Sequence, residues 1–134
     1  MNAGGDLRHR GDGPVPVGIE DPLHPYDNVA PMLVVPLDNA ALATSGGARR
    51  GWDIAGEWYP HVIDPRSGIP VRHHASVSVL APDAATADVV ATVVGVLTTD
   101  EAVAFVTGIP SVSCCAVSPT GELRTSSDWP AGAG

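Results

Sequence analysis

The sequence predicts an α+β fold in which a mostly antiparallel sheet packs against two helices. Residues 75–80 alternate between polar and apolar side chains, which is the pattern of a strand. Two helical segments follow, at 83–97 and 100–107, and strand pairs joined by glycine-containing turns lie on both sides of them. The chain has 134 residues, the size of one domain, so we expect a single core.

The first third of the chain predicts strands separated by irregular connections. Residues 15–19 form a short apolar stretch beside prolines, which favours a strand at the edge of a sheet. Residues 32–37 predict a second strand, ended by two polar residues. We expect residues 40–44 to form one short helical turn before the next glycine pair.

A hairpin is predicted in the middle of the chain, with strands at 49–54 and 57–63 around an Ala-Gly turn. Most of the aromatic surface of the chain lies on this hairpin, on Trp52, Trp58 and Tyr59. We expect these side chains to pack across the two strands.

The clearest helix begins at Asp83, which we expect to cap a helical body from Ala84 to about Leu97. Asp88 and Thr92 are four residues apart and therefore project from one face. We expect that face to lie beside a core stripe of Val89, Val93, Val96 and Leu97. The strand before the helix is expected to be half-buried, with its two valines inward and its two serines outward.

A closing hairpin is expected at 111–117 and 122–126. On its first strand the adjacent Cys114 and Cys115 point to opposite faces, so we interpret them as small core residues rather than a metal site or disulfide framework. The net charge of -8 argues against a nucleic-acid partner. The sequence has no signal-peptide pattern and no apolar run long enough to span a bilayer.

The segment from His61 to Gly68 reads His-Val-Ile-Asp-Pro-Arg-Ser-Gly and predicts the end of a strand followed by a fixed turn. Pro65 fixes its own φ, and Gly68 can adopt a positive φ. Asp64 is a typical turn-capping carboxylate in front of a proline. Two interpretations stay open: an ordinary turn with solvated charges, or a functional turn that presents His61, Asp64 and Arg66 together.

Four motifs, in this order, resemble those of the ApbE family, the FAD:protein FMN transferases. Asn2–Asp6 is similar to the family's N-x-G-G-D/N segment, and Ala43–Gly46 matches its A-T-S-G segment. His61–Gly68 is similar to H-x-I-D-P-R-T-G, and Ala87–Thr92 matches A-D-x-x-A/S-T. The resemblance covers most of the chain and implies the carboxy-terminal part of an ApbE-like, T-fold-like domain, with a sheet packed on helices.

The resemblance implies a Mg²⁺-dependent transfer of FMN from FAD to a Thr or Ser hydroxyl of a target flavoprotein, with release of AMP. Such a reaction requires that phosphate charge is neutralised and that an oxygen nucleophile is held in line. Asp88 and Thr92 match the family's metal ligands, and their hard oxygens are donors that Mg²⁺ prefers. A solvated helix face is the alternative interpretation of this pair.

Five further residues are implied to bind the flavin nucleotide: Gly4, Gly5, Asp6, His61 and Val62. The two glycines would let the backbone approach the ligand, and Asp6 would either join them or cap the bend. His61 matches the histidine that is important for transfer. Neutral His61 would accept the hydroxyl proton, protonated His61 would hold a phosphate oxygen, and a structural role is the third alternative.

The other motif residues are given structural roles first. We expect Arg66 to anchor its own turn through Asp64, with a fixed positive charge for the ligand as the alternative. Thr44 and Ser45 are likewise expected to be structural.

The family's amino-terminal half, to which most adenine and flavin contacts and part of the metal site belong, has no counterpart here. Met1 stands where a strand is expected to be under way already. We therefore expect residues 1–134 to be one partial domain that is inactive alone and that self-associates through an exposed sheet edge. A non-catalytic flavin-nucleotide or metal-binding module and a structural remnant are the alternatives. Family members often act as lipid-anchored or secreted proteins, so the compartment stays open, and it is cytoplasmic if Met1 is the genuine start.

Overall fold

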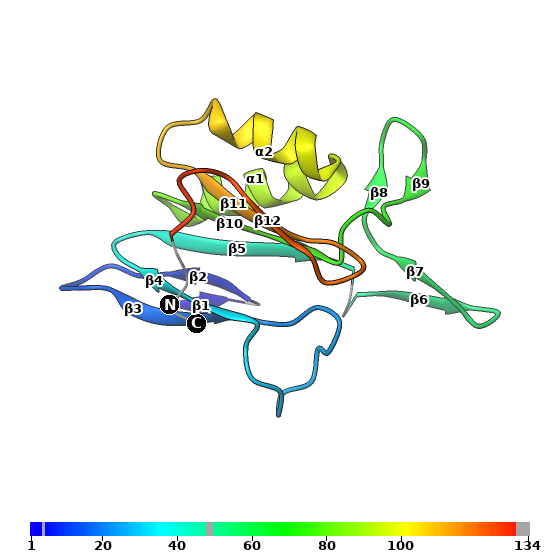
Figure 1. Cartoon of the computed structure of the whole chain (residues 1–134), viewed down its shortest axis with the longest axis horizontal. Coiled ribbons are helices and arrows are strands. Elements are labelled where there is room, and N and C mark those ends of the chain that lie inside the picture. Colours follow the sequence, from blue (N-terminus) through cyan, green and yellow to red (C-terminus); the bar gives the residue numbers. More distant parts are fainter. Residues whose placement is uncertain (4, 48–49, 131–134) are drawn as a thin grey trace.

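The computed structural model describes residues 1–3, 5–47 and 50–130, and their main element is a six-stranded antiparallel sheet (Figure 1). The strand order is β1-β2-β5-β10-β11-β12. Their bounds are Asn2–Ala3 (β1), Asp6–Arg8 (β2), Ala41–Gly46 (β5), Ser76–Ala81 (β10), Ser113–Val117 (β11) and Leu123–Thr125 (β12). The predicted closing hairpin is thus confirmed as β11 and β12.

Three further strand pairs lie outside this sheet. They are β3 (Val15–Ile19) with β4 (Leu33–Leu37), β6 (Gly51–Ile54) with β7 (Glu57–Pro60), and β8 (Ile63–Asp64) with β9 (Ile69–Pro70). The β3–β4 pair lies under the sheet, whereas the other two pairs project beyond its end (Figure 1). We call residues 51–70, which run from β6 to β9, the arm. The predicted middle hairpin is confirmed, with Trp52 opposite Tyr59.

Two helices cover the face of the sheet that lies opposite the β3–β4 pair (Figure 1). Helix α1 spans Ala84–Val96 and α2 spans Thr99–Thr107. Asp83 caps α1 as expected, since its carboxylate accepts a hydrogen bond from the Thr86 N–H at 2.9 Å. Helix α2 begins with a capping box between Thr98 and Glu101. Neither helix is long and apolar enough to cross a membrane.

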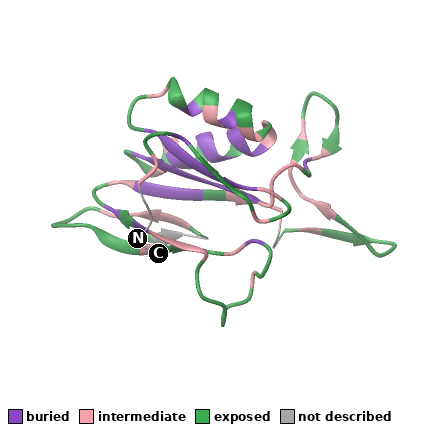
Figure 2. Cartoon of the chain, viewed as in Figure 1, coloured by how far each residue is buried: buried purple, intermediate pink, exposed green. Residues whose placement is uncertain are grey.

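Strand β10 is buried on both faces, which makes the expectation of a half-buried strand at 75–80 wrong (Figure 2). On the helix side the core contains Ala43, Val77, Val79 and Val94, among others. On the other side Leu42 and Leu80 pack against Ile19, Val35 and Leu37 of the β3–β4 pair. The serines of β10 are therefore buried too, and Ser78 satisfies its hydroxyl by a 2.8 Å hydrogen bond to the Thr44 hydroxyl.

Helix α1 buries a different stripe from the one predicted from its valines. Val89 is 61% exposed, and the buried residues are Ala87, Val90, Ala91, Val94 and Gly95. Valines occupy both exposed and buried positions of this helix, with Val89 exposed and Val90 buried, so their spacing alone does not select a face. Small residues face the sheet because the helix lies close to it: a Cβ on Gly95 would be 2.9 Å from Ser45 Oγ.

The expected helical turn at 40–44 is wrong, because residues 41–44 belong to β5 in the middle of the sheet. Strand β5 pairs with β10 on one side and with β2 on the other. Alanine favours helices in isolation, but hydrogen bonding to two strands outweighs this intrinsic preference.

Candidate functional site

A cavity of about 650 Å³ opens where β2, the end of β3, β5 and α1 meet. Its volume is in the range of sites for cofactors and small molecules. Five of the seven predicted site residues line it: Gly5, Asp6, His61, Asp88 and Thr92. Val62 borders a separate hollow of about 10 Å³, and Gly4 lies outside the described residues.

Helix α1 contributes Asp88 and Thr92, one turn apart on the face that borders the cavity. Ala91, between them in sequence, also lines the cavity, while Val90 and Val94 anchor the helix in the core. The Thr92 hydroxyl donates its proton to the Asp88 carbonyl at 3.0 Å. The lone pairs of Thr92 Oγ1 therefore stay available to an electrophile, in an orientation that the backbone fixes.

Gly5, in the turn before β2, and Asp6, the first residue of β2, also line the cavity. Gly5 has a φ of 104°, which a residue with a side chain rarely adopts. Burial raises the pKa of the Asp6 carboxyl, the charge of Asp88 raises it further, and the charge of Arg50 lowers it. Asp6 and Asp88 thus repel each other across the cavity, and a bound cation would relieve this repulsion.

The backbone of Arg50 holds His61 in a defined orientation. Its carbonyl oxygen lies 3.0 Å from His61 Nδ1 and accepts the His61 N–H at 3.2 Å. A carbonyl can only accept, so Nδ1 carries the proton in this arrangement. In the neutral ring, Nε2 is then the nitrogen with the lone pair, which is the tautomer that a general base requires.

Three polar residues of the cavity wall were not among those expected from the sequence: Arg50, Ser76 and Glu20. Arg50 supplies a positive charge, and the only sequence signal for it was its place after the A-T-S-G segment. Ser76 Oγ is buried without a hydrogen-bond partner among the described residues, so a ligand could satisfy it. The alternation on the strand at 75–80 placed Ser76 on one face with Ser78, a face that was expected to be exposed but is buried. Thr44 and Ser45 also line the cavity.

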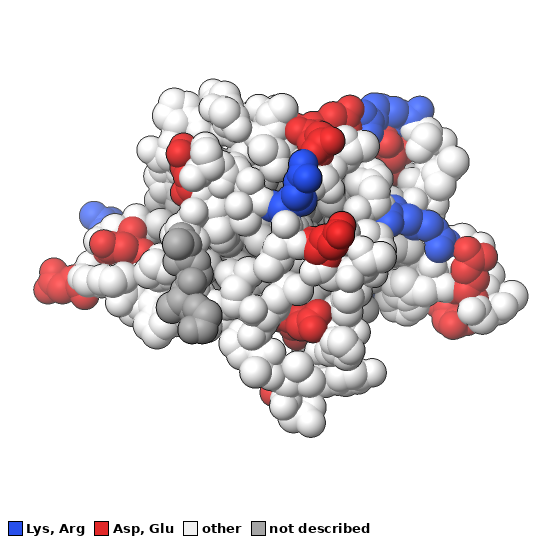
Figure 3. Space-filling model, viewed as in Figure 1, with Lys and Arg blue, Asp and Glu red and all other residues white. Residues whose placement is uncertain are grey.

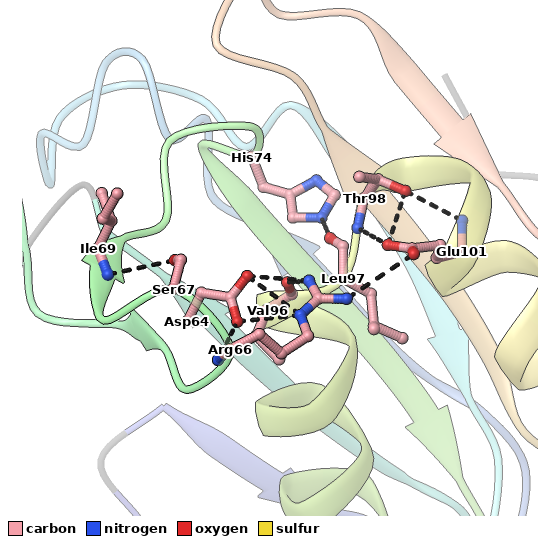
Figure 4. Close-up of polar contacts among 9 residues, drawn as sticks. All are labelled: Asp64, Arg66, Ser67, Ile69, His74, Val96, Leu97, Thr98 and Glu101. Carbon is pink, nitrogen blue, oxygen red and sulfur yellow. Dashed lines mark hydrogen bonds and ion pairs between the residues drawn. The ribbon is translucent and has the colours of Figure 1, made fainter.

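The turn after His61 forms as expected, but its residues 64–68 do not line the cavity. Asp64 Oδ1 accepts the Arg66 N–H at 2.8 Å, which is the predicted capping of the turn by its own side chain. The Arg66 guanidinium binds both Asp64 oxygens, at 2.9 to 3.2 Å, and lowers the pKa of that carboxyl (Figure 4). The anchoring role expected for Arg66 is therefore present, and Arg66 is not among the cavity residues.

Charged side chains outside the cavity form mixed pairs. On the face drawn in Figure 3, basic side chains lie beside acidic ones. Ion pairs of this kind join Arg72 to Glu57 at 2.9 Å and Arg124 to Asp100 at 2.8 Å. Exposed pairs such as these contribute little to stability.

Comparison with known proteins gives consistent results in sequence and in structure. The sequence profile of the ApbE family matches residues 1–116. The FAD:protein FMN transferase of Haemophilus influenzae is 37% identical over 107 residues, which are 76% of this chain and 31% of that protein. The FAD:protein FMN transferase of Treponema pallidum is 34% identical over 111 residues, or 82% of this chain and 30% of that protein.

A solved structure shows the same similarity in three dimensions. The crystal structure of the ApbE protein from Thermotoga maritima matches with a TM-score of 0.80 and 29% identity, over 94% of this chain and 41% of that chain. The α+β class and the arrangement of sheet and helices are thereby confirmed. The chain spans less than half the length of each of these three relatives.

Proposed function

The chain belongs to the ApbE family, and we propose that its cavity binds FAD and Mg²⁺ as part of an FAD:protein FMN transferase site. One observation carries this proposal. Five residues that match the family motifs come from three distant parts of the sequence and line one cavity of about 650 Å³. A solvated helix face would not require Asp88 and Thr92 to face Gly5, Asp6 and His61.

In the proposed reaction, the hydroxyl oxygen of a Thr or Ser in a target flavoprotein attacks the phosphorus atom of the FMN half of FAD. A phosphoester bond forms, the pyrophosphate bond breaks, and the bridging oxygen leaves with AMP. The hydroxyl proton must pass to a base. The protein therefore has to neutralise phosphate charge and to hold the nucleophile in line.

The donor atoms of α1 fit a hard divalent cation. The Asp88 carboxylate and the lone pairs of Thr92 Oγ1 are oxygen ligands from one helix face, and Mg²⁺ takes few protein ligands of this type. When bound, Mg²⁺ would neutralise charge on the pyrophosphate. Gly5 and Asp6 would bind the nucleotide, and Ser76 Oγ offers an unused hydrogen-bonding group.

We assign His61 the role of general base. The Arg50 carbonyl accepts a hydrogen bond from the protonated Nδ1. In the neutral ring Nε2 is therefore free to take the proton of the attacking Thr or Ser hydroxyl. Arg50 adds a fixed positive charge to the cavity for a phosphate oxygen. We also propose that Val62, the residue after His61, and Gly4 bind the nucleotide.

The proposal is tested by titrating the purified chain with FAD in the presence and absence of Mg²⁺, following flavin fluorescence. We expect Mg²⁺-dependent binding that Asp88→Ala weakens by about tenfold or more, since one metal ligand is lost. Asp100→Ala is the matched control, because this carboxylate on α2 is 87% exposed and does not line the cavity.

A second matched pair tests the hydroxyl ligand. Thr92→Val should weaken Mg²⁺-dependent binding, whereas Thr107→Val should not, although Thr107 makes the same hydrogen bond to the carbonyl four residues before it. No FAD binding under any condition would contradict the proposal.

A further inference from the structure

The arm (residues 51–70) makes no strand pairing with the six-stranded sheet in the part of the chain that the structure describes. Strand β6 pairs with β7 and β8 pairs with β9, so their ladder hydrogen bonds stay within the two hairpins. Other contacts must therefore fix how the arm sits on the sheet and helices. One is the Trp58 indole, whose Nε1–H donates to the Gly47 carbonyl at 2.8 Å.

Arg66 provides another such contact, at the far end of the arm (Figure 4). While its guanidinium binds Asp64, Nη2 also donates to the carbonyl of Val96 at 3.1 Å, the last residue of α1. Nη1 lies 3.8 Å from Glu101 Oε1 in the first turn of α2. One side chain thus joins the turn between β8 and β9 to the end of one helix and the start of the next.

The C-terminus of α1 has one capping hydrogen bond of its own, from the Leu97 N–H to the Val94 carbonyl at 3.2 Å, and its last carbonyls have partners outside the helix. The C-cap residue Leu97 is extended, with φ -85° and ψ 156°, and the last turn contains no basic residue. The final carbonyls of a helix have no partner within it and attract positive charge. Arg66 binds the Val96 carbonyl, and His74 Nε2 lies 2.6 Å from the Leu97 carbonyl.

We propose that Arg66 is a positioning residue that sets the placement of His61 relative to Asp88 and Thr92. His61 stands at the base of the β8–β9 hairpin, and Thr92 lies one helical turn before Val96. The bond from Arg66 to Val96 therefore links the segment with the proposed base to the helix with the proposed metal ligands. This inference rests on the proposed function, because the roles of those three residues come from it.

The test uses the whole 134-residue chain in four forms: wild type, Arg66→Ala, Arg66→Lys and Arg124→Ala. Lysine keeps the charge but is a single point donor, so it cannot bind Asp64 through two nitrogens and reach Val96 together. Arg124→Ala is the matched control, since it removes an exposed arginine whose carboxylate partner, Asp100, is also in the first turn of α2.

Hydrogen exchange reports on the arm without requiring any ligand. The amide of Gly68, in the arm, donates to the Asp64 carbonyl. The amide of Val71, the residue after the arm, donates to the Val62 carbonyl. In Arg66→Ala we expect both to exchange about tenfold faster, with β10 and β11 unchanged and Arg66→Lys intermediate. Equal exchange in Arg66→Ala and wild type would overturn the proposal, and so would the same acceleration in Arg124→Ala.

The distance between the two halves of the site is followed by NMR with Mn²⁺ and FAD. In wild type, Mn²⁺ at Asp88 and Thr92 should broaden the NMR signals of the His61 ring. These signals are assigned by their loss in His61→Gln. Arg66→Ala should reduce this broadening while changing the Mn²⁺ affinity by less than about threefold. Unchanged broadening would overturn the positioning role. If wild type binds no Mn²⁺, the proposed function fails, and the exchange rates of Gly68 and Val71 still decide whether Arg66 holds the arm.

Discussion

Asp6 illustrates at the residue scale how a binding site can oppose stability. Its carboxyl pKa in the folded chain lies above the ordinary value of 3.8, through burial and the charge of Asp88. An acid with a raised pKa in the folded state binds protons more tightly there than in the unfolded chain. Ionised Asp6 therefore lowers stability at neutral pH, and this cost disappears as the pH falls below the ordinary value.

We expect Asp6→Asn to raise the free energy of unfolding at pH 7 by about 0.5–1 kcal/mol, the scale of a partly screened charge interaction. The difference should vanish near pH 3, where both forms are uncharged at this position. Denaturant unfolding at the two pH values measures it, with the exposed Asp100→Asn as control. A loss of stability at pH 7 would mean that Asp6 makes a net favourable contact.

At the element scale, the end of α1 gives the chain a specific sensitivity to acid. Burial lowers the pKa of His74, whose Nε2 lies against the Leu97 carbonyl. The unfolded chain then takes up a proton near the ordinary value of 6.5 while the folded chain does not. The contribution of His74 to stability therefore falls as the pH drops from 6.5 to the lowered folded pKa, and this contribution is constant below it.

We expect His74→Gln to reduce the loss of unfolding free energy between pH 7.5 and 5.5 by up to about 1 kcal/mol. Glutamine can still donate to the Leu97 carbonyl, so the cap is kept. His24→Gln is the control, since His24 is exposed and pairs with Asp21. The carboxylates with lowered pKa values, such as Asp64 and Glu101, lose their contribution only near pH 4 and below. An unchanged slope in His74→Gln would contradict this assignment.

The same scale shows what the sequence could and could not predict. The cap at Asp83, the hairpins and the Asp64 turn follow from local rules, and all are confirmed. The wrong expectations depended on partners that lie far away in sequence. Residues 41–44 form a strand because β10 pairs with all of them and β2 with the first two, and the alanines of α1 face inward because the sheet is close. Arg50 lines the cavity beside His61, to which it is joined by a backbone hydrogen bond between residues eleven positions apart.

At the scale of the whole molecule, the sheet ends in two short edge strands, β1 and β12. All three residues of β12 are exposed, including Leu123. An unpaired edge can add a strand from a second copy, although Arg124 at the centre of β12 opposes this. Self-association through the sheet edge therefore stays a prediction.

Light scattering over a range of protein concentrations should detect dimers in the wild type and fewer in Leu123→Lys, because a charge on the edge hinders pairing. Leu23→Lys is the control, since Leu23 is exposed to a similar degree but lies outside the sheet. A monodisperse monomer at every concentration would contradict the prediction.

The close approach of α1 to the sheet also determines which sequence changes this protein can tolerate. Ala87, Ala91 and Gly95 face a strand that itself presents alanines, so this part of the core has few atoms to lose. Substitutions by larger side chains are the disruptive ones here, because each added methyl group pushes the helix away from the sheet. Asp88 and Thr92 move with that helix. Variants with larger apolar side chains between α1 and the sheet would alter the cavity before they unfold the chain. Selection on function would therefore keep the side chains at this contact small, even if the chain were stable enough to tolerate larger ones.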